Sequence, residues 1–217
     1  MSTHDYFEQY IKAVTQPLPL MKEYFDLENA YLENLVDGES TVHDVGCGNG
    51  RTMIHLAPKV KKIVGIDYDE EMYQATKNNI AQFENAEAVL GDFFQFEPKE
   101  KYNLVFASYN LLGSMEVAVD KRKELIQKMI DCASSGGHIV ISVWSDQGLD
   151  FAKEYYSDIG IIVRDIQNNE VITDHGVFKR FTKEELHDLF RHFKLDYKLI
   201  ELNKIFYTID ISKPRDL

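Results

Sequence analysis

The chain of 217 residues has few of the residues that mark several protein classes. Its two cysteines, Cys47 and Cys132, are too far apart for a Cys-x-x-Cys pair, so we expect no cysteine metal cluster and no metal cofactor. No apolar leader follows Met1, and no apolar run approaches the roughly 18 residues of a membrane span. We therefore expect a cytoplasmic protein that is neither secreted nor inserted in a membrane.

Positive charge is also scarce. The 24 Lys and Arg residues stand against 36 Asp and Glu, which gives a formal charge of −12. Nucleic-acid-binding domains usually carry a basic patch or stripe, so this balance argues against a nucleic-acid partner. A chain of this length can bury one sizeable core, which predicts a single domain over residues 1–217, present as a monomer or a homodimer.

A glycine-rich stretch, His43-Asp44-Val45-Gly46-Cys47-Gly48-Asn49-Gly50-Arg51, organises the sequence. It follows the apolar pair Thr41-Val42 and precedes a helical-looking run that starts at Thr52, so it predicts strand, tight loop and helix. Glycines permit positive φ and let a ligand approach the backbone. We expect the loop amides and the positive end of the following helix to contact an anionic group, with Cys47 chosen for its small size.

An acidic residue ends the next predicted strand, Lys62-Ile63-Val64-Gly65-Ile66-Asp67. It follows the glycines by about twenty residues, which suits a βαβ unit whose second acid binds a ribose diol. Both ribose hydroxyls can donate to one carboxylate. Asp67 has an alternative role as the N-cap of the helix that begins near Glu70.

These motifs together resemble a known family. Asp44-x-Gly-x-Gly-x-Gly, Gly65-Ile66-Asp67 and Leu90-Gly91-Asp92 are similar to the successive motifs of class I S-adenosylmethionine-dependent methyltransferases, over roughly residues 40–145. The resemblance implies an α/β, doubly wound, mostly parallel seven-stranded sheet with an antiparallel last strand, and S-adenosyl-L-methionine as cofactor. A nicotinamide-binding loop would more usually read Gly-x-Gly-x-x-Gly, whereas here the third glycine comes one residue early.

The resemblance also implies site residues. It implies that Asp44, before the glycines, helps to hold the methionine end, although Asp44 could instead only order the loop. It also implies that Asp92 accepts a hydrogen bond from the adenine amino group, although Asp92 could instead be only a turn residue. Tyr68 and Phe93 are candidate walls for the adenine, or ordinary core aromatics. The cofactor-binding residues that we expect are Asp44, Gly46, Cys47, Gly48, Gly50, Asp67, Tyr68, Asp92, Phe93 and Ser108.

Two segments flank this frame. Residues 1–37 read as two helices separated at Pro17 and Pro19, and the first, rich in tyrosine, either forms a lid over the cofactor or packs at the sheet edge. Residues 147–181 read as a helix and a β-hairpin turning at Asn168-Asn169. This segment resembles the inserted substrate cap that many small-molecule methyltransferases carry. Further helices are expected at 69–83, 120–133 and 182–192, and strands at 86–90, 101–110, 138–144, 197–202 and 206–211.

The acceptor is less well specified. The chain has no Asp/Asn-Pro-Pro-aromatic motif, which is typical of enzymes that methylate amino groups of bases or glutamine, and no Pro-Cys pair for a covalent mechanism. Both absences favour a small-molecule acceptor. Candidates for a general base are Tyr109, Asp146, His175 and His4, and no spacing selects among them. The alternatives are a transfer-RNA wobble-base methyltransferase, a catalytically silent cofactor-binding subunit and a nicotinamide oxidoreductase.

Overall fold

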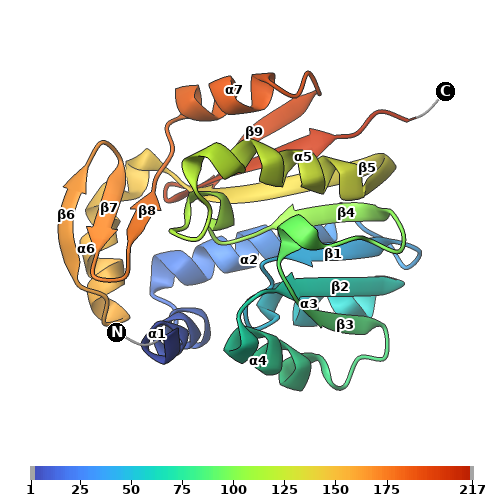
Figure 1. The fold of residues 1–217 in the computed structure, drawn as a ribbon, viewed down its shortest axis with the longest axis horizontal. Coiled ribbons are helices and arrows are strands. Elements are labelled where there is room, and N and C mark those ends of the chain that lie inside the picture. Colours follow the sequence, from blue (N-terminus) through green and yellow to red (C-terminus); the bar gives the residue numbers. More distant parts are fainter. Residues whose placement is uncertain (1–2, 216–217) are drawn as a thin grey trace.

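The fold is built on a seven-stranded sheet. The computed structural model describes residues 3–215, with side chains from residue 6 onward. The strands lie in the order β3-β2-β1-β4-β5-β10-β9, and β10 alone runs antiparallel to its neighbours, which confirms the predicted architecture (Figure 1). Their bounds are β1 Thr41–Val45, β2 Lys62–Asp67, β3 Ala86–Leu90, β4 Tyr102–Ala107, β5 Ala133–Trp144, β9 Tyr197–Asn203 and β10 Phe206–Ser212.

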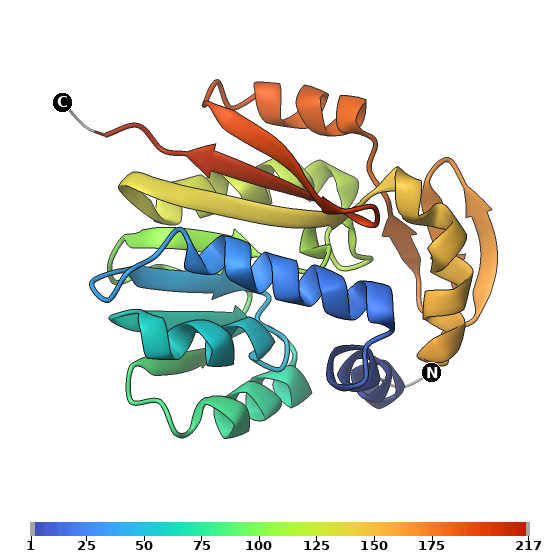
Figure 2. The ribbon, with the colours of Figure 1, turned by 180° about the vertical axis from the view of Figure 1, so that it is seen from behind.

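Helices cover both faces of the sheet. Figure 2 shows α2, α3 and α4 on one face, and Figure 1 shows α5 and α7 on the other. The bounds are α2 Pro19–Glu33, α3 Arg51–Leu56, α4 Glu70–Ile80, α5 Arg122–Cys132 and α7 Lys183–Arg191. Thr182 caps α7 in a capping box with Glu185, as the sequence predicts. No helix within residues 3–215 is both long enough and apolar enough to cross a membrane.

The first helix, α1 (Thr3–Thr15), lies across the end of the sheet beside α6 (Leu149–Asp158) (Figure 2). Pro19 stands at the first position of α2, where its missing N–H removes no helical bond, so the predicted separation of the two helices is confirmed. Contacts hold α1 to the end of α6: the Gln9 amide donates to the Gly160 carbonyl at 3.2 Å, and Lys12 donates to the Asp158 carbonyl.

The expected cap contains one more strand than the sequence indicates. A hairpin of β6 (Val163–Gln167) and β7 (Glu170–Thr173) turns at Asn168-Asn169, whose φ angles of 51° and 60° are those of a type I′ turn. A third strand, β8 (Val177–Lys179), pairs with β7. The two ends of this segment meet at the sheet, because Ser145 bridges to Phe181 and the Phe181 amide donates to the Trp144 carbonyl at 2.9 Å.

One expected loop is wrong. We expected residues 134–137 to link helix and strand, but β5 already begins at Ala133, which pairs with Tyr102. The register shifts along this pairing, and Gly136 has a φ of 75°, so glycine accommodates an irregularity inside the strand rather than a turn before it.

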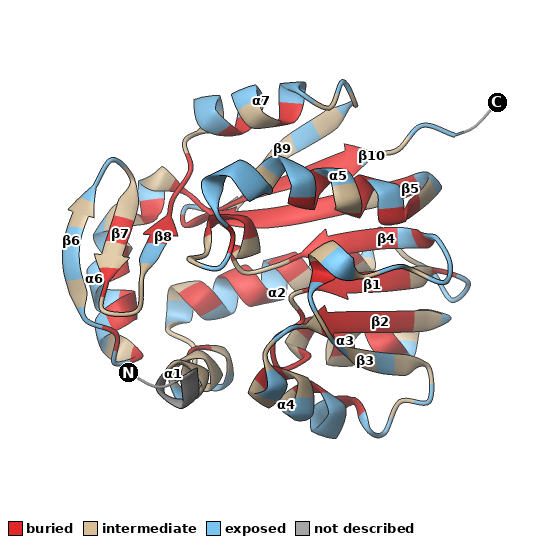
Figure 3. Cartoon of the chain, viewed as in Figure 1, coloured by how far each residue is buried: buried red, intermediate tan, exposed pale blue. Residues whose placement is uncertain are grey.

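Short 3-10 turns complete the connections: η1 Ala57–Lys59, η2 Phe93–Gln95, η3 Leu111–Gly113, η4 Val119–Lys121 and η5 Asp146–Gly148. Buried residues follow the central strands and the inner faces of the helices (Figure 3). Three apolar clusters result. One lies under α5 and α7, one lies under α2, α3 and α4, and the third joins α1, α2 and α6 to the cap.

Candidate active site

Two adjoining cavities lie at the carboxyl ends of the central strands. The sheet order reverses between β1 and β4, and ligands of open α/β sheets bind at such a point. The first cavity, of about 840 Å³, lies toward β2 and β3, and the second, of about 960 Å³, extends toward β5 and the cap; both are partly open to solvent. They share Gly46, Asp67, Tyr68, Leu111 and Glu116, so one ligand can occupy both.

The glycine loop is fastened to β2 rather than left with free amides. The N–H groups of Gly46 and Cys47 both donate to the Ile66 carbonyl, at 2.9 and 3.0 Å, and the Gly50 N–H donates to the Cys47 carbonyl at 2.9 Å. These three amides are thus already bonded within the protein, and contact of the loop with an anionic group stays a prediction. The following helix, α3, has only six residues, which limits the positive end that it offers.

Asp67 lies between the two cavities. Its carboxylate accepts from the Gly48 N–H at 2.9 Å and from the Asp69 N–H at 3.1 Å. The N-cap of α4 is Asp69, which accepts from the N–H groups of Glu71 and Met72, so the alternative role of Asp67 as a cap is wrong. Burial raises the pKa of Asp67 to about 6. Binding of a ribose by Asp67 stays a prediction.

Predicted residues that flank an adenine line the first cavity. Asp92 accepts from the Phe94 N–H at 2.9 Å as cap of a 3-10 turn, and it also borders the cavity, so the turn role does not exclude the other. Phe93 is a buried wall, whereas Tyr68 is 58% exposed at the rim. Ser108, the other predicted contact, borders the second cavity.

Three predicted cofactor residues line neither cavity. Asp44 is buried, and burial raises the pKa of its carboxyl although Arg51 opposes that effect. The Cys47 thiol is buried 3.7 Å from the Thr76 hydroxyl, and burial raises its pKa, which makes it a poor nucleophile. Gly50 faces α4, where an added Cβ would lie 3.1 Å from Thr76. These three residues support the loop from the protein interior rather than from the cavity side.

Aromatic side chains dominate the second cavity. The Tyr10 hydroxyl of α1 lies directly over Gly48, since an ideal Cβ there would lie 2.1 Å from it. Tyr109 has a left-handed φ of 57°, and its hydroxyl is hydrogen-bonded to that of Tyr155. Burial raises the pKa of Tyr109 well above its ordinary value, so at neutral pH it is a hydrogen-bond donor rather than a base.

The other base candidates lie away from the cavity lining. Asp146 accepts from the Tyr207 hydroxyl at 3.0 Å, and the His175 ring packs 5.5 Å from Tyr6, a residue that does line the cavity. The His4 side chain lies outside the described residues. Sequence reasoning missed Glu116, which borders both cavities, accepts from the Tyr68 hydroxyl and has a pKa raised by burial. It lies in an irregular loop where no periodicity marks it.

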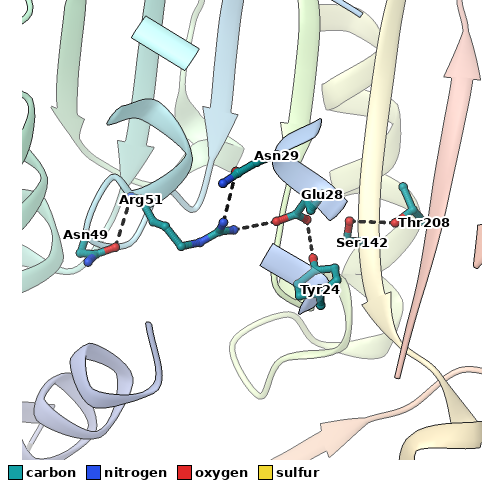
Figure 4. Close-up of polar contacts among 7 residues, drawn as sticks. All are labelled: Tyr24, Glu28, Asn29, Asn49, Arg51, Ser142 and Thr208. Carbon is teal, nitrogen blue, oxygen red and sulfur yellow. Dashed lines mark hydrogen bonds and ion pairs between the residues drawn. The ribbon is translucent and has the colours of Figure 1, made fainter. Parts of the chain in front are cut away.

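A buried polar network ties α2 to the start of α3 (Figure 4). Arg51 and Glu28 form an ion pair of 2.6 Å, with side chains 15% and 1% exposed. The Tyr24 hydroxyl also donates to Glu28, and the Arg51 guanidinium lies 4.2 Å from the centre of the Phe25 ring. Burial opposes the charge on Arg51, but Glu28 together with Tyr24 and Tyr10 more than offsets it, so the pKa of Arg51 is raised.

Comparison with known proteins identifies the family. A family described as a methyltransferase domain matches residues 37–194. A probable cobalt-precorrin-6B C(15)-methyltransferase (decarboxylating) of Methanococcus maripaludis strain C6 is 31% identical over 113 residues, which are 50% of this chain and 62% of that protein. The chain thus spans less than two thirds of the length of that curated relative.

Solved structures share the fold. An S-adenosylmethionine-dependent methyltransferase from Clostridium acetobutylicum ATCC 824 superposes with a TM-score of 0.70 at 15% identity, over 97% of this chain and 98% of that one. The DhpI–SAM–HEP complex gives a TM-score of 0.70 at 16% identity, over 96% and 94%. Since the family match covers most of the sequence and the sheet order agrees, this chain belongs to the class I S-adenosylmethionine-dependent methyltransferases.

Proposed function

We propose that the protein transfers a methyl group from S-adenosyl-L-methionine to a small-molecule acceptor. The observation that carries this proposal is the pair of joined cavities at the sheet switch point. In the proposal the adenosine occupies the first cavity, with Asp92 and Phe93 at the base and Asp67 at the ribose. The methionine end lies in the second cavity beside Gly46 and Gly48. The likeness to DhpI, which was solved with SAM, supports this choice of cofactor.

The lining of the second cavity supports a small acceptor. Helix α1 and the cap each contribute to its lining, and aromatic rings from several elements line it, among them Tyr6, Tyr109, Trp144 and Tyr155. Of the described residues, no Lys or Arg lines either cavity, whereas a nucleic-acid substrate would need such residues at its phosphates. This favours a small molecule over transfer RNA.

The chemistry needs alignment more than a strong base. Methyl transfer is an in-line displacement in which the acceptor atom, the methyl carbon and the sulfur lie on one line, and holding them so supplies much of the rate. Aromatic faces attract the cationic sulfonium. The residues closest to the transferable methyl are those after β4, Ser108 and Tyr109, and Glu116 is the carboxylate placed to take a proton where the acceptor must lose one.

Calorimetry with S-adenosylmethionine and S-adenosylhomocysteine tests the cofactor, and a product assay on a metabolite panel then tests the reaction. We expect Asp67→Ala to weaken cofactor binding roughly 10- to 150-fold, the range for hydrogen bonds to charged groups. Asp26→Ala, on the exposed side of α2, is the matched control and should bind normally. Unchanged affinity in Asp67→Ala would exclude the ribose assignment.

The remaining alternatives give different results in the same experiment. A silent subunit binds the cofactor and produces methylated product only after a partner is added. A nicotinamide oxidoreductase, which would respond to NADH and not to S-adenosylhomocysteine, is already excluded by the family match. The proposal requires both cofactor binding and turnover by the chain alone.

A further inference from the structure

The residues at the far end of the second cavity indicate which kind of chemical group binds there. We call this end the far chamber; its walls are Trp144 at the end of β5, Tyr155 and Tyr156 of α6, and Phe178 of β8. Of the three carboxylates that line the second cavity, Asp67 and Glu116 also border the first cavity, and Asp69 is engaged as the N-cap of α4. The far chamber itself is therefore aromatic.

Against this wall lies an arginine, Arg180, that has no carboxylate or hydrogen-bond partner within residues 6–215. Arg180 is 0% exposed, and its guanidinium lies 4.5 Å from the centre of the Trp144 ring. Its Nε and both Nη atoms have no hydrogen-bond partner among the described residues. Burial lowers the pKa of Arg180, and the nearby hydroxyls of Tyr156 and Tyr155, not a carboxylate, favour its charge. A buried cation without an anion is unfavourable for the fold, so its presence needs another explanation.

A second buried donor in the chamber is also unused. Asn110 is 2% exposed and lines the cavity, and its Oδ1 accepts from the Trp144 N–H at 3.0 Å. That bond fixes the orientation of the amide, so the Nδ2 group is the one that remains without a partner. One unpaired donor group thus lies beside the Trp144 backbone and another lies against the Trp144 ring.

The tyrosines supply a third kind of donor. In the bond between the Tyr109 and Tyr155 hydroxyls one proton is used and the other stays free to donate. Burial raises the pKa of both Tyr155 and Tyr156, so at neutral pH these hydroxyls carry their protons. These donor groups therefore lack an acceptor, and above all a negatively charged one.

We propose that the methyl acceptor carries an oxyanion, a carboxylate or a phosphoryl-type group, which binds in the far chamber. Its oxygens accept from Asn110 Nδ2 and from the hydroxyls of Tyr155 and Tyr156. Arg180 is a positioning residue whose charge acts across the wall, where low polarity keeps electrostatic attraction strong. That the bound molecule is the methyl acceptor rests on the proposed function, but the oxyanion site itself can be tested without any methyl transfer.

Thermal unfolding of the full chain, saturated with S-adenosylhomocysteine, tests the site. Sodium phosphate, sodium acetate and tetramethylammonium chloride are titrated separately at constant ionic strength set with NaCl. We expect phosphate or acetate to raise Tm by about 3–6 °C at ten times its Kd, and tetramethylammonium to have no effect. Arg180→Met should abolish the response and, without ligand, raise Tm above that of the wild type, because an unpaired buried charge is removed.

Two further variants keep the test decisive. Asn110→Asp retains the acceptor for the Trp144 N–H and tolerates the left-handed φ of 68°, but it places a negative charge in the chamber and should also abolish the response. Arg164→Met, on the exposed side of the cap, is the matched control and should keep it. Three results would each overturn the proposal: an equal increase of Tm with phosphate or acetate in all variants, no such increase in the wild type, or a lower ligand-free Tm in Arg180→Met than in the wild type.

Failure of the two proposals is distinguishable. If calorimetry finds no binding of S-adenosylhomocysteine, the proposed function fails, and the anion titration repeated without it still tests the oxyanion site. If S-adenosylhomocysteine binds but the anion response fails any of the criteria above, the oxyanion site alone is excluded.

Discussion

Replacing Glu28 with alanine should destabilise the fold more than any exposed substitution in the same helix. Glu28 is 1% exposed and carries both the ion pair to Arg51 at 2.6 Å and the hydrogen bond from Tyr24. Its removal leaves a mostly buried guanidinium and a buried hydroxyl without their acceptor. Removing one partner of a buried ion pair costs about 3–5 kcal/mol. This figure includes the loss of the Tyr24 hydrogen bond, because both interactions use the same carboxylate and their energies are not additive.

This loss is a large share of the 5–15 kcal/mol that typically separates folded from unfolded states. Urea unfolding followed by circular dichroism measures it as a lower midpoint at unchanged slope. Asp26→Ala is the control, because its ion pair with Lys22 also has a length of 2.6 Å but exposed fractions of 64% and 65%, and it should cost no more than about 0.5 kcal/mol. A loss below about 1 kcal/mol in Glu28→Ala would refute the reasoning.

Two further predictions concern the site. Burial raises the pKa of Asp67 to about 6, above an ordinary value near 4, so this carboxyl lowers the stability of the ligand-free fold as pH rises from about 4 to 6. A ribose is bound best by the ionised form, so calorimetry should show tighter S-adenosylhomocysteine binding over the same window, and Asp67→Asn should remove this step. Gly48→Ala places a Cβ against the Tyr10 hydroxyl at a φ of 56°, which costs about 1–2 kcal/mol and should lower Tm by several degrees; an unchanged Tm would contradict this.

The sheet could be predicted from the sequence because its determinants are local. Strand β2 is an apolar run that ends at Asp67, and Gly46 and Gly91 directly follow β1 and β3. Thr182 with Glu185 forms a capping box that needs no tertiary contact. Strand β8 was missed because its three residues are too few for a periodic pattern. The start of β5 was missed because Gly136-Gly137 reads as a turn, whereas a bulge inside a strand uses the same residue type.

The site divides in the same way. Gly46, Gly48, Asp67, Asp92 and Ser108 line the cavities because their positions follow strand ends, which the sequence marks. Asp44 lies inside β1 and is buried within the sheet. Cys47 and Gly50 line neither cavity, because whether a loop residue faces the ligand or the core depends on how the loop is bonded to β2. Nothing local identifies Glu116 or Arg180, since what distinguishes them is the surroundings that distant segments create.

The closed base of the cap, where Ser145 and Phe181 bridge, has an evolutionary consequence. A segment whose two ends touch can be lengthened, shortened or exchanged with little change in loop-closure entropy for the rest of the chain. The residues that this segment brings to the far chamber, Tyr155, Tyr156 and Phe178, can therefore diverge between descendants while the first cavity stays as it is. Specificity for new acceptors can then arise through changes in this one segment of the chain.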